Sequence, residues 1–177
     1  KKPIIGFIGT ISKVVDLELI VKLAKELNEY SIVLIGPIMT NINILLKIHN
    51  IFILQERDHD DLPNYLSHFK CAIIPYLIND YTNSVYSVKL NEYFASGLPV
   101  VSTSINENIL INNNNENIIL IGSNHNDFIG KVRRIMEDKI KLNIQEAIRF
   151  AESNSWNNKV KKILSIIQEN VDTKEII

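Results

Sequence analysis

The sequence alternates short, continuously apolar runs with longer stretches in which apolar residues recur at helical spacing. A continuous apolar run of this length is typical of a strand buried on both faces of a parallel sheet. Six such runs lie at residues 3–9, 31–37, 51–55, 71–76, 99–103 and 117–122. Helices are expected at about 17–29, 41–48, 60–69, 88–96, 125–137, 143–152 and after Ser155. The alternation predicts the α/β class, a Rossmann-like open parallel sheet of about six strands with helices on both faces.

Capping and breaking residues suggest several boundaries. Asp16 is suited to cap the helix that follows it, because its carboxylate can accept a hydrogen bond from a free amide of the first turn. Pro75 is expected to end strand pairing, and Gly97 to end the helix before it. A polar loop is expected over 77–86, and the stretch "INNNNENI", residues 111–118, is expected to be a tolerant surface loop.

The composition narrows the class of protein. The 177 residues suit one domain with a sizeable core, and the content of 46% apolar and 22% charged residues is typical of a globular chain. The formal net charge of −1 argues against a broad basic surface, so no nucleic-acid partner is expected. No apolar run approaches the ~18 residues of a membrane span. The chain starts without Met and without a leader, so we expect a fragment of a longer protein.

Cysteine and histidine give no sign of a metal site. The lone Cys71 lies in the apolar run "CAIIPY" and is expected to be a buried core thiol, which fits a reducing, cytoplasmic setting. The histidines are scattered without the helical or hairpin spacing of metal ligands, so no metal site is expected. They are His49, His59, His68 and His125.

Four segments are expected at the carboxyl edge of the sheet, where ligands bind in doubly wound folds. The first contains Gly9, Thr10 and Ser12, which combine a close approach to the backbone with two hydroxyl groups. Gly6 and Gly9 do not complete the dinucleotide fingerprint, because no third glycine opens the helix. A plain tight turn is the alternative interpretation of this segment.

The helix expected over 88–96 carries two charges of interest. Its amino end points to the carboxyl edge, where free amides and the helix dipole favour an anion. Lys89 in that first turn is unfavourable for the dipole unless an anion meets it, and Glu92 could accept hydrogen bonds from two ribose hydroxyls. The alternative is an i,i+3 surface ion pair between Lys89 and Glu92, worth ~0.3 kcal/mol.

Arg57 and Trp156 are two further side chains of interest. Arg57 follows the third apolar run and is the first arginine of the chain. At the binding edge it could hold a phosphate or the edge of a base, and it could equally pair with one of its acidic neighbours, which are Asp58, Asp60 and Asp61. Trp156 begins the last helix and is expected to be a packing anchor.

Five segments, in this order, resemble the C-terminal half of a GT-B glycosyltransferase. They are "FIGTIS" with "DLELI", then "SIVLIGP", "LPNYLSHFKCAIIPY", "VKLNEYFASGLPVVST" and the late "SW" before a terminal helix. The pattern K-x-x-E-Y-x-A-x-G-x-P-V-V in the fourth segment is the most specific part. The resemblance covers nearly the whole chain, and it is strongest to bacterial enzymes that build capsular, teichuronic or other surface polysaccharides.

The resemblance implies roles for individual residues. The segment from Gly9 through Thr10 to Ser12 would approach the diphosphate of a nucleotide-sugar donor. Lys89 would lie near the phosphates or the sugar, and Glu92 would hold the donor ribose. Arg57 would lie beside the nucleobase.

Two positions depart from the family pattern. Ser84 stands where many members that retain anomeric configuration carry a glutamate that contacts the transferred sugar. Val88 stands where the related subgroup often has proline. The departure at Ser84 leaves the identity of the sugar and its contacts open.

The resemblance also implies a domain plan. Residues 1–170 would form the nucleotide-sugar donor-binding domain, which is one half of the GT-B fold, and residues 171–177 a frayed tail. The acceptor-binding N-terminal domain would lie outside this chain and supply any general base. No metal or other cofactor is expected.

The function implied is binding of a nucleotide-diphosphate sugar for transfer to a saccharide or lipid-linked acceptor in surface polysaccharide synthesis. The whole protein would be a hexosyltransferase-type enzyme of the cytoplasm, with peripheral contact with the inner membrane face through the missing half, and this piece alone would be inactive. One alternative is a non-catalytic GT-B-like module that binds a nucleotide or a partner. Another is a different doubly wound protein, such as a dinucleotide-dependent oxidoreductase or a sugar-nucleotide epimerase.

Overall fold

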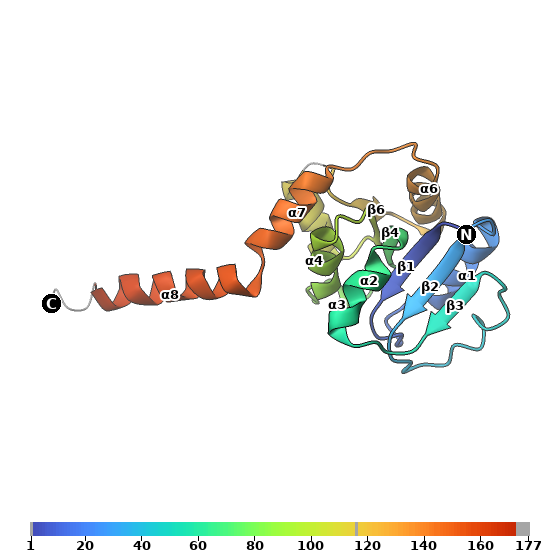
Figure 1. Ribbon diagram of the computed structural model, residues 1–177, viewed down its shortest axis with the longest axis horizontal. Coiled ribbons are helices and arrows are strands. Elements are labelled where there is room, and N and C mark those ends of the chain that lie inside the picture. The colour runs from blue at the N-terminus through green and yellow to red at the C-terminus, as the bar shows by residue number, and fades with distance from the viewer. Residues whose placement is uncertain (1, 116, 173–177) are drawn as a thin grey trace.

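The computed structural model describes residues 2–115 and 117–172, and its centre is a parallel sheet of six strands (Figure 1). The strand order is β3-β2-β1-β4-β5-β6. The strands are β1 Ile4–Ile8, β2 Ser31–Ile35, β3 Ile51–Leu54, β4 Phe69–Ile74, β5 Val100–Thr103 and β6 Leu120–Gly122. The order reverses between β1 and β4, so ligands are expected in the crevice at the carboxyl ends of these two strands.

Helices cover both faces of the sheet, as predicted. The helices are α1 Leu17–Glu26, α2 Leu62–Leu66, α3 Asp80–Asn83, α4 Val88–Ala95, α5 Asn106–Asn114, α6 His125–Met136, α7 Ile144–Ser153 and α8 Trp156–Asp172, with a 3₁₀ turn η1 at His59–Asp61. One core joins the sheet to α1 and α6, and the other joins it to α2, α4, α5 and α7. The predicted α/β class and the six apolar strands are therefore confirmed.

The central strands are buried on both faces because their side chains alternate between the two cores. In β1, Ile5 and Phe7 join the core under α1 and α6, while Ile8 joins the opposite core. Cys71 of β4 is fully buried, and burial raises the pKa of its thiol far above the usual range. The expected core thiol is confirmed, and its neutral form suits packing rather than reaction.

The predicted helix and strand ends are largely confirmed. The Asp16 carboxylate caps α1 by accepting a 2.8 Å hydrogen bond from the Leu19 amide. Strand β4 ends at the residue before Pro75, and α4 ends two residues before Gly97. The run predicted at 71–76 is shifted, since β4 begins at Phe69.

Three predictions about local structure are wrong. Residues 41–48 form turns rather than a helix, because the Asn41 side chain accepts a 2.9 Å hydrogen bond from the Asn43 amide and so favours a local turn. The expected loop over 77–86 contains α3, and the one over 111–118 includes the end of α5. Burial of Ile111 explains why α5 forms, since packing overrides the weak helix propensity of its asparagines.

The last helix, α8, extends away from the sheet and its covering helices (Figure 1). Its first residue, Trp156, is 80% exposed, so the prediction of a packing anchor is wrong for this chain. The helix runs through Asp172, and residues 173–177 of the expected tail lie outside the described residues. No helix in the described part of the chain is both long and apolar enough to cross a bilayer.

Candidate functional site

A cleft of about 350 Å³ lies at the carboxyl edge of the sheet, where the ends of β1, β2 and β3 meet the start of α4. We call it the carboxyl-edge cleft. Five of the predicted site residues, namely Gly9, Thr10, Arg57, Lys89 and Glu92, line it together. The other lining residues, which the sequence did not single out as site residues, are Ile8, Ile35, Gly36, Pro37, Glu56, Leu62 and Val88.

The floor of the carboxyl-edge cleft is formed by backbone. Gly9 has a φ of 141°, a conformation that favours glycine, and its amide donates a 2.8 Å hydrogen bond to the Ile35 carbonyl. A Cβ atom on Gly36 would lie 2.3 Å from the Gly9 oxygen, so only glycine allows the two turns to approach so closely. A ligand can therefore reach main-chain atoms at the end of β1.

Helix α4 begins beside this floor without a capping side chain. Ser87 is the N-cap residue, but its side chain makes no capping hydrogen bond, and its buried Oγ has no protein partner. By contrast α1, α6 and α7 are capped by the side chains of Asp16, Asn124 and Asn143. The Leu90 amide donates a 3.0 Å hydrogen bond to the Ser87 carbonyl, whereas the amides of Val88 and Lys89 have no acceptor among the described residues. These two amides can bind an outside group, and the helix dipole favours an anion there.

Lys89 projects from the first turn of α4 across Gly9. Its ammonium donates a hydrogen bond to the Tyr76 hydroxyl and lies 5.0 Å from the centre of the Tyr76 ring and 5.6 Å from that of Phe7. A Cβ atom on Gly9 would lie 2.7 Å from Lys89 Cε, so the glycine leaves the space that the lysine occupies. No carboxylate of the described residues lies within ion-pair distance of this half-buried charge.

The alternative of a Lys89–Glu92 surface pair is wrong, because no such ion pair is present among the described residues. Glu92 Oε1 lies instead 3.8 Å from Nε2 of His59, whose side chain is 83% exposed. The Glu92 side chain is 37% exposed and borders the cleft. Its carboxylate keeps acceptor capacity for an incoming ligand.

Tyr93 is a site-forming residue that the sequence did not single out. Its hydroxyl accepts a 2.8 Å hydrogen bond from the Ile8 amide and donates a 3.3 Å bond to the Ile8 carbonyl. The residue is fully buried, and burial raises the pKa of the hydroxyl well above its ordinary value. The tyrosine thus ties α4 to the end of β1 and holds Lys89 and Glu92 at the cleft. The tyrosine that ends the K-x-x-E-Y pattern was the available signal.

Arg57 lies exposed at the far side of the cleft. The guanidinium donates a 3.5 Å hydrogen bond to the Glu56 carbonyl and lies 5.8 Å from the centre of the Tyr65 ring. None of the neighbouring aspartates forms an ion pair with it in the described residues. The guanidinium is therefore available to a ligand at this edge.

Two predicted residues lie outside the carboxyl-edge cleft. Ser12 lines a neighbouring hollow of about 590 Å³ together with Lys13 and Met39. Ser84 is exposed after α3, and its hydroxyl donates a 2.8 Å hydrogen bond to the Asp80 carbonyl. The structure thus separates these serines from the five residues that meet in the cleft.

A larger hollow of about 620 Å³ lies between α1 and residues 43–48. It includes no strand end, and much of its wall is apolar, with Val21, Ile44 and Ile48 among its lining residues. We assign the site to the smaller cleft, because strand ends, an uncapped helix start and charges without a counter-ion in the described part of the chain meet there. No group of three or more potential metal ligands occurs among the described residues.

The arrangement combines binding features for three kinds of chemical group. The α4 amino end and Lys89 suit an anion, and Glu92 suits a pair of hydroxyls one helical turn away. The apolar wall formed by Ile8, Ile35 and Leu62 and the guanidinium of Arg57 suit a flat polar ring. A nucleoside diphosphate carries all three.

Comparison with known proteins points to one family. The family model described as "Glycosyl transferases group 1" matches residues 2–138. TuaH of Bacillus subtilis (strain 168), which is named as a teichuronic acid biosynthesis glycosyltransferase, is 25% identical to this chain over 166 residues. That match covers 91% of this chain and 42% of TuaH, so the chain spans less than half the length of this relative.

Solved structures share the fold at low sequence identity. Sucrose-phosphate synthase from Thermosynechococcus elongatus matches with a TM-score of 0.76 and 13% identity, over 98% of this chain and 46% of that chain. HepE from Anabaena, solved in complex with UDP-glucose, matches with a TM-score of 0.72 and 12% identity, over 100% of this chain and 50% of that chain. These matches establish a common architecture.

Proposed function

The chain belongs to the glycosyl transferases group 1 family, and we propose that it is the donor-binding half of a GT-B glycosyltransferase. Residues 1–170 would bind a nucleotide-diphosphate sugar for transfer to a saccharide or lipid-linked acceptor in surface polysaccharide synthesis. Support comes from the relative TuaH, named for teichuronic acid biosynthesis, and from HepE, which was solved with UDP-glucose.

One observation carries the proposal: the uncapped amino end of α4 lies beside the glycine floor with an unpaired ammonium. In the proposed complex, the amides of Val88 and Lys89 at the start of α4 and the Lys89 ammonium bind the diphosphate next to Gly9 and Thr10. Glu92 binds the ribose, and Arg57 lies beside the base. Ser12 stays assigned to the segment that approaches the diphosphate, although it lines the neighbouring hollow, and Ser84 is assigned to the sugar end of the donor.

The chemistry follows from the charge that develops during transfer. Breaking the bond between the sugar and its phosphate leaves a nucleoside diphosphate with additional negative charge. Positioned amides, the helix dipole and the Lys89 ammonium stabilise this charge as it forms, and their fixed orientation avoids reorganisation during the step. These groups perform the leaving-group stabilisation that a bound cation supplies in other phosphate sites.

The acceptor side of the reaction is assigned to a second domain of the same protein. The chain spans 42% of TuaH and 50% of HepE, which leaves room in such relatives for a partner domain of similar size. In this proposal that domain binds the acceptor, supplies any general base and makes any peripheral contact with the inner membrane face, and the enzyme works in the cytoplasm. The 177-residue chain alone would bind donor without transferring sugar.

A non-catalytic nucleotide-binding module is the second candidate. The observation that favours it is Ser84, which stands at the position of an expected acid and whose hydroxyl is bonded to the Asp80 carbonyl. Sugar transfer by the full-length protein to a saccharide or lipid-linked acceptor would exclude this candidate. Nucleotide binding without transfer, with every acceptor tried, would favour it.

Calorimetric titration of the 177-residue chain with UDP, GDP, ADP and NAD tests the donor-binding proposal. We expect one nucleoside diphosphate to bind with an affinity between micromolar and millimolar. Substitution Glu92→Gln is expected to weaken that binding about tenfold, because a charge-assisted hydrogen bond to ribose is lost. The effect should be much smaller for the 2′-deoxy form of the same nucleotide.

A matched control is Glu146→Gln on α7, where the carboxylate pairs with Arg149 on the surface away from the cleft. This change should leave nucleotide affinity as it is in the unsubstituted chain. Tight binding of NAD with no binding of any nucleoside diphosphate would contradict the proposal and favour an oxidoreductase.

A further inference from the structure

The Lys89 ammonium is held by aromatic groups rather than by a carboxylate. It donates a hydrogen bond to the Tyr76 hydroxyl and lies over the faces of the Tyr76 and Phe7 rings. Ring faces attract a cation without neutralising it, so the full positive charge remains available to an anion. A four-carbon side chain has many rotamers, and within residues 2–115 and 117–172 the polar side-chain contact that selects one of them is the Tyr76 hydroxyl.

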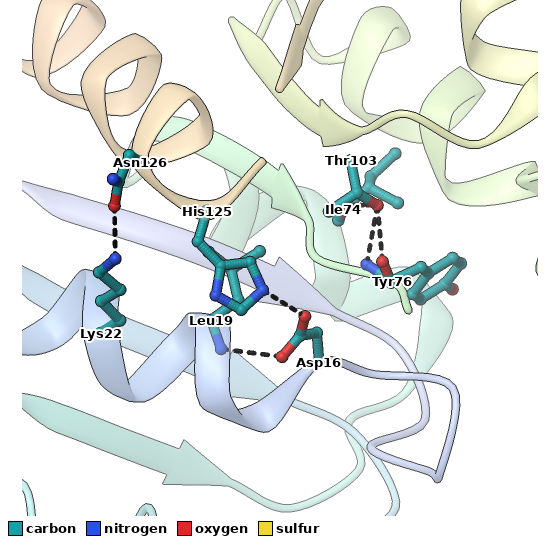
Figure 2. A network of polar contacts seen from close by, with 8 residues as sticks. All are labelled: Asp16, Leu19, Lys22, Ile74, Tyr76, Thr103, His125 and Asn126. Carbon is teal, nitrogen blue, oxygen red and sulfur yellow. Dashed lines mark hydrogen bonds and ion pairs between the residues drawn. The ribbon is translucent and has the colours of Figure 1, made fainter. Parts of the chain in front are cut away.

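The backbone of Tyr76 is fixed from the β5 side (Figure 2). The Thr103 hydroxyl accepts a 3.2 Å hydrogen bond from the Tyr76 amide and donates a 2.8 Å bond to the Tyr76 carbonyl. The same hydroxyl lies 3.4 Å from the Ile74 carbonyl. Thr103 is itself buried at the end of β5. The backbone of Tyr76 is therefore held in place close to the point where the strand order reverses, between β1 and β4.

The loop after β1 fixes Tyr76 from the other side. Residues Val15 and Tyr76 form an antiparallel bridge, and the Leu77 amide donates a 2.8 Å hydrogen bond to the Val14 carbonyl. The Asp16 amide donates a 2.7 Å bond to the carbonyl of Pro75.

Asp16 is in turn anchored to two helices (Figure 2). Its carboxylate caps α1 through the Leu19 amide and lies 2.8 Å from Nε2 of His125 at the start of α6. The position of Tyr76 is therefore coupled to both helices of one face of the sheet.

We propose that Tyr76 is a positioning residue, which holds the Lys89 ammonium in the one orientation that meets the donor diphosphate; this inference rests on the proposed donor-binding function. Tyr76 is not one of the residues that line the carboxyl-edge cleft, so its effect on the ligand passes through Lys89. The hydroxyl limits the lysine to a bound-like rotamer before the nucleotide arrives, and less conformational entropy is then lost on binding.

A double-mutant cycle on the 177-residue chain tests this inference. The variants are Tyr76→Phe, Lys89→Met and the double substitution, and the ligands are UDP and uridine, measured by calorimetry. We expect Tyr76→Phe to weaken UDP binding about threefold to tenfold, the range of one hydrogen bond, and to leave uridine binding unchanged. In the Lys89→Met background the tyrosine substitution should cause no further loss.

A ligand-free signature accompanies the cycle. In nuclear magnetic resonance spectra of the lysine ammonium groups, the Lys89 signal is identified by its absence from the spectrum of Lys89→Met. We expect this signal to be sharp while the ammonium is hydrogen-bonded to the Tyr76 hydroxyl. Tyr76→Phe keeps both rings and should broaden or shift that signal. The matched control is Tyr30→Phe, at a tyrosine that packs against the core next to α1, and it should change neither the signal nor UDP affinity.

The outcomes separate the inference from the function on which it rests. A wild-type chain that binds none of the nucleoside diphosphates would overturn both. UDP binding that Tyr76→Phe leaves unchanged would overturn only the role of Tyr76. An equal loss in the wild-type and Lys89→Met backgrounds, with unfolding temperatures unchanged, would also overturn it, because the tyrosine would then act without the lysine.

Discussion

Charged side chains have different partners in two regions of the molecule, the carboxyl-edge cleft and the corner where β6 meets α6. They are paired with opposite charges in the corner, but among the described residues Lys89 and Arg57 have no counter-ion in the cleft. In the corner, the Asp127 carboxylate accepts hydrogen bonds from the Ser123 amide at 2.9 Å and from the Lys131 ammonium at 2.7 Å. In the cleft, Lys89 faces two aromatic rings and a hydroxyl, and Arg57 faces a carbonyl and a ring.

This difference indicates where a charged ligand would bind. A charge that is paired within the fold contributes to stability and has little left to offer a partner. A half-buried charge without a counter-ion has lost part of its hydration and regains free energy when an ion of opposite sign arrives. Removing charge from the cleft should therefore change binding, and removing it from the corner should change stability.

The sharpest test replaces one lysine in each region by methionine. Lys89→Met is expected to weaken UDP binding by about 1.5–3 kcal/mol, because a hydrogen bond between charged groups is lost. Its unfolding free energy should stay close to that of the parent chain. Isothermal titration and urea unfolding measure the two quantities on the same samples.

Lys131→Met is the counterpart in the corner. It should leave UDP affinity unchanged and lower the unfolding free energy by less than about 1 kcal/mol, since the pair with Asp127 is partly exposed. If the two variants behaved alike in both measurements, the distinction between the two regions would fail.

A glycine in each region gives the next largest effect. Gly9→Ala should lower the unfolding free energy by about 1–2 kcal/mol, because the backbone has a φ of 141° and the new Cβ would lie 2.7 Å from Lys89 Cε. Displacement of the lysine should weaken UDP binding as well.

Gly130 in α6 is the matched position, since a Cβ there would meet no atom within 4 Å. Gly130→Ala should raise the unfolding free energy by about 0.5–1 kcal/mol through helix propensity and leave binding unchanged. Thermal unfolding followed by circular dichroism measures the stability of both glycine variants, and calorimetry with UDP measures their binding. A Gly9→Ala chain as stable as its parent would contradict the close approach of Lys89 to Gly9.

The smallest effect concerns pH. The hydrogen bond from Lys131 lowers the pKa of Asp127 below its ordinary value of 3.8. A carboxyl group with a lowered folded-state pKa stabilises the fold above its unfolded-state pKa, and this contribution is lost as the pH falls through the folded-state value. Asp127→Asn should therefore lower the unfolding free energy by less than about 1 kcal/mol at neutral pH, with the difference shrinking in acid below the ordinary pKa.

Urea unfolding at neutral pH and at acidic pH checks the sign. A difference between Asp127→Asn and the parent chain that grows in acid would contradict the assignment. UDP affinity of this variant at neutral pH should equal that of the parent, as the comparison between the two regions requires.

Much of the fold could be predicted because its signals are local. The continuous apolar runs located all six strands, and Asp16 marked the start of α1, since burial on both faces and capping depend on neighbouring residues. The prediction failed at residues 41–48, where an asparagine side chain stabilises a turn. It also missed α5, which depends on burial of Ile111 against the sheet.

The site was only partly predictable. Lys89 and Glu92 could be singled out because their place at a helix start on the carboxyl edge follows from element order. The spacing of the two residues could not decide between an ion pair and a ligand site. That decision depends on Tyr76, which accepts a hydrogen bond from the lysine, and on His59, which lies near the glutamate.

The sequence by itself therefore determined the six strands, most of the helices between them and the edge of the sheet at which a ligand is expected. Those properties follow from periodicity and capping over a few residues. Only the tertiary structure decided that Lys89 crosses Gly9 to reach Tyr76, and that Tyr93 ties α4 to Ile8, a residue 85 positions away. Such contacts depend on strand order, register and the packing of distant elements, and no local pattern of residues specifies them.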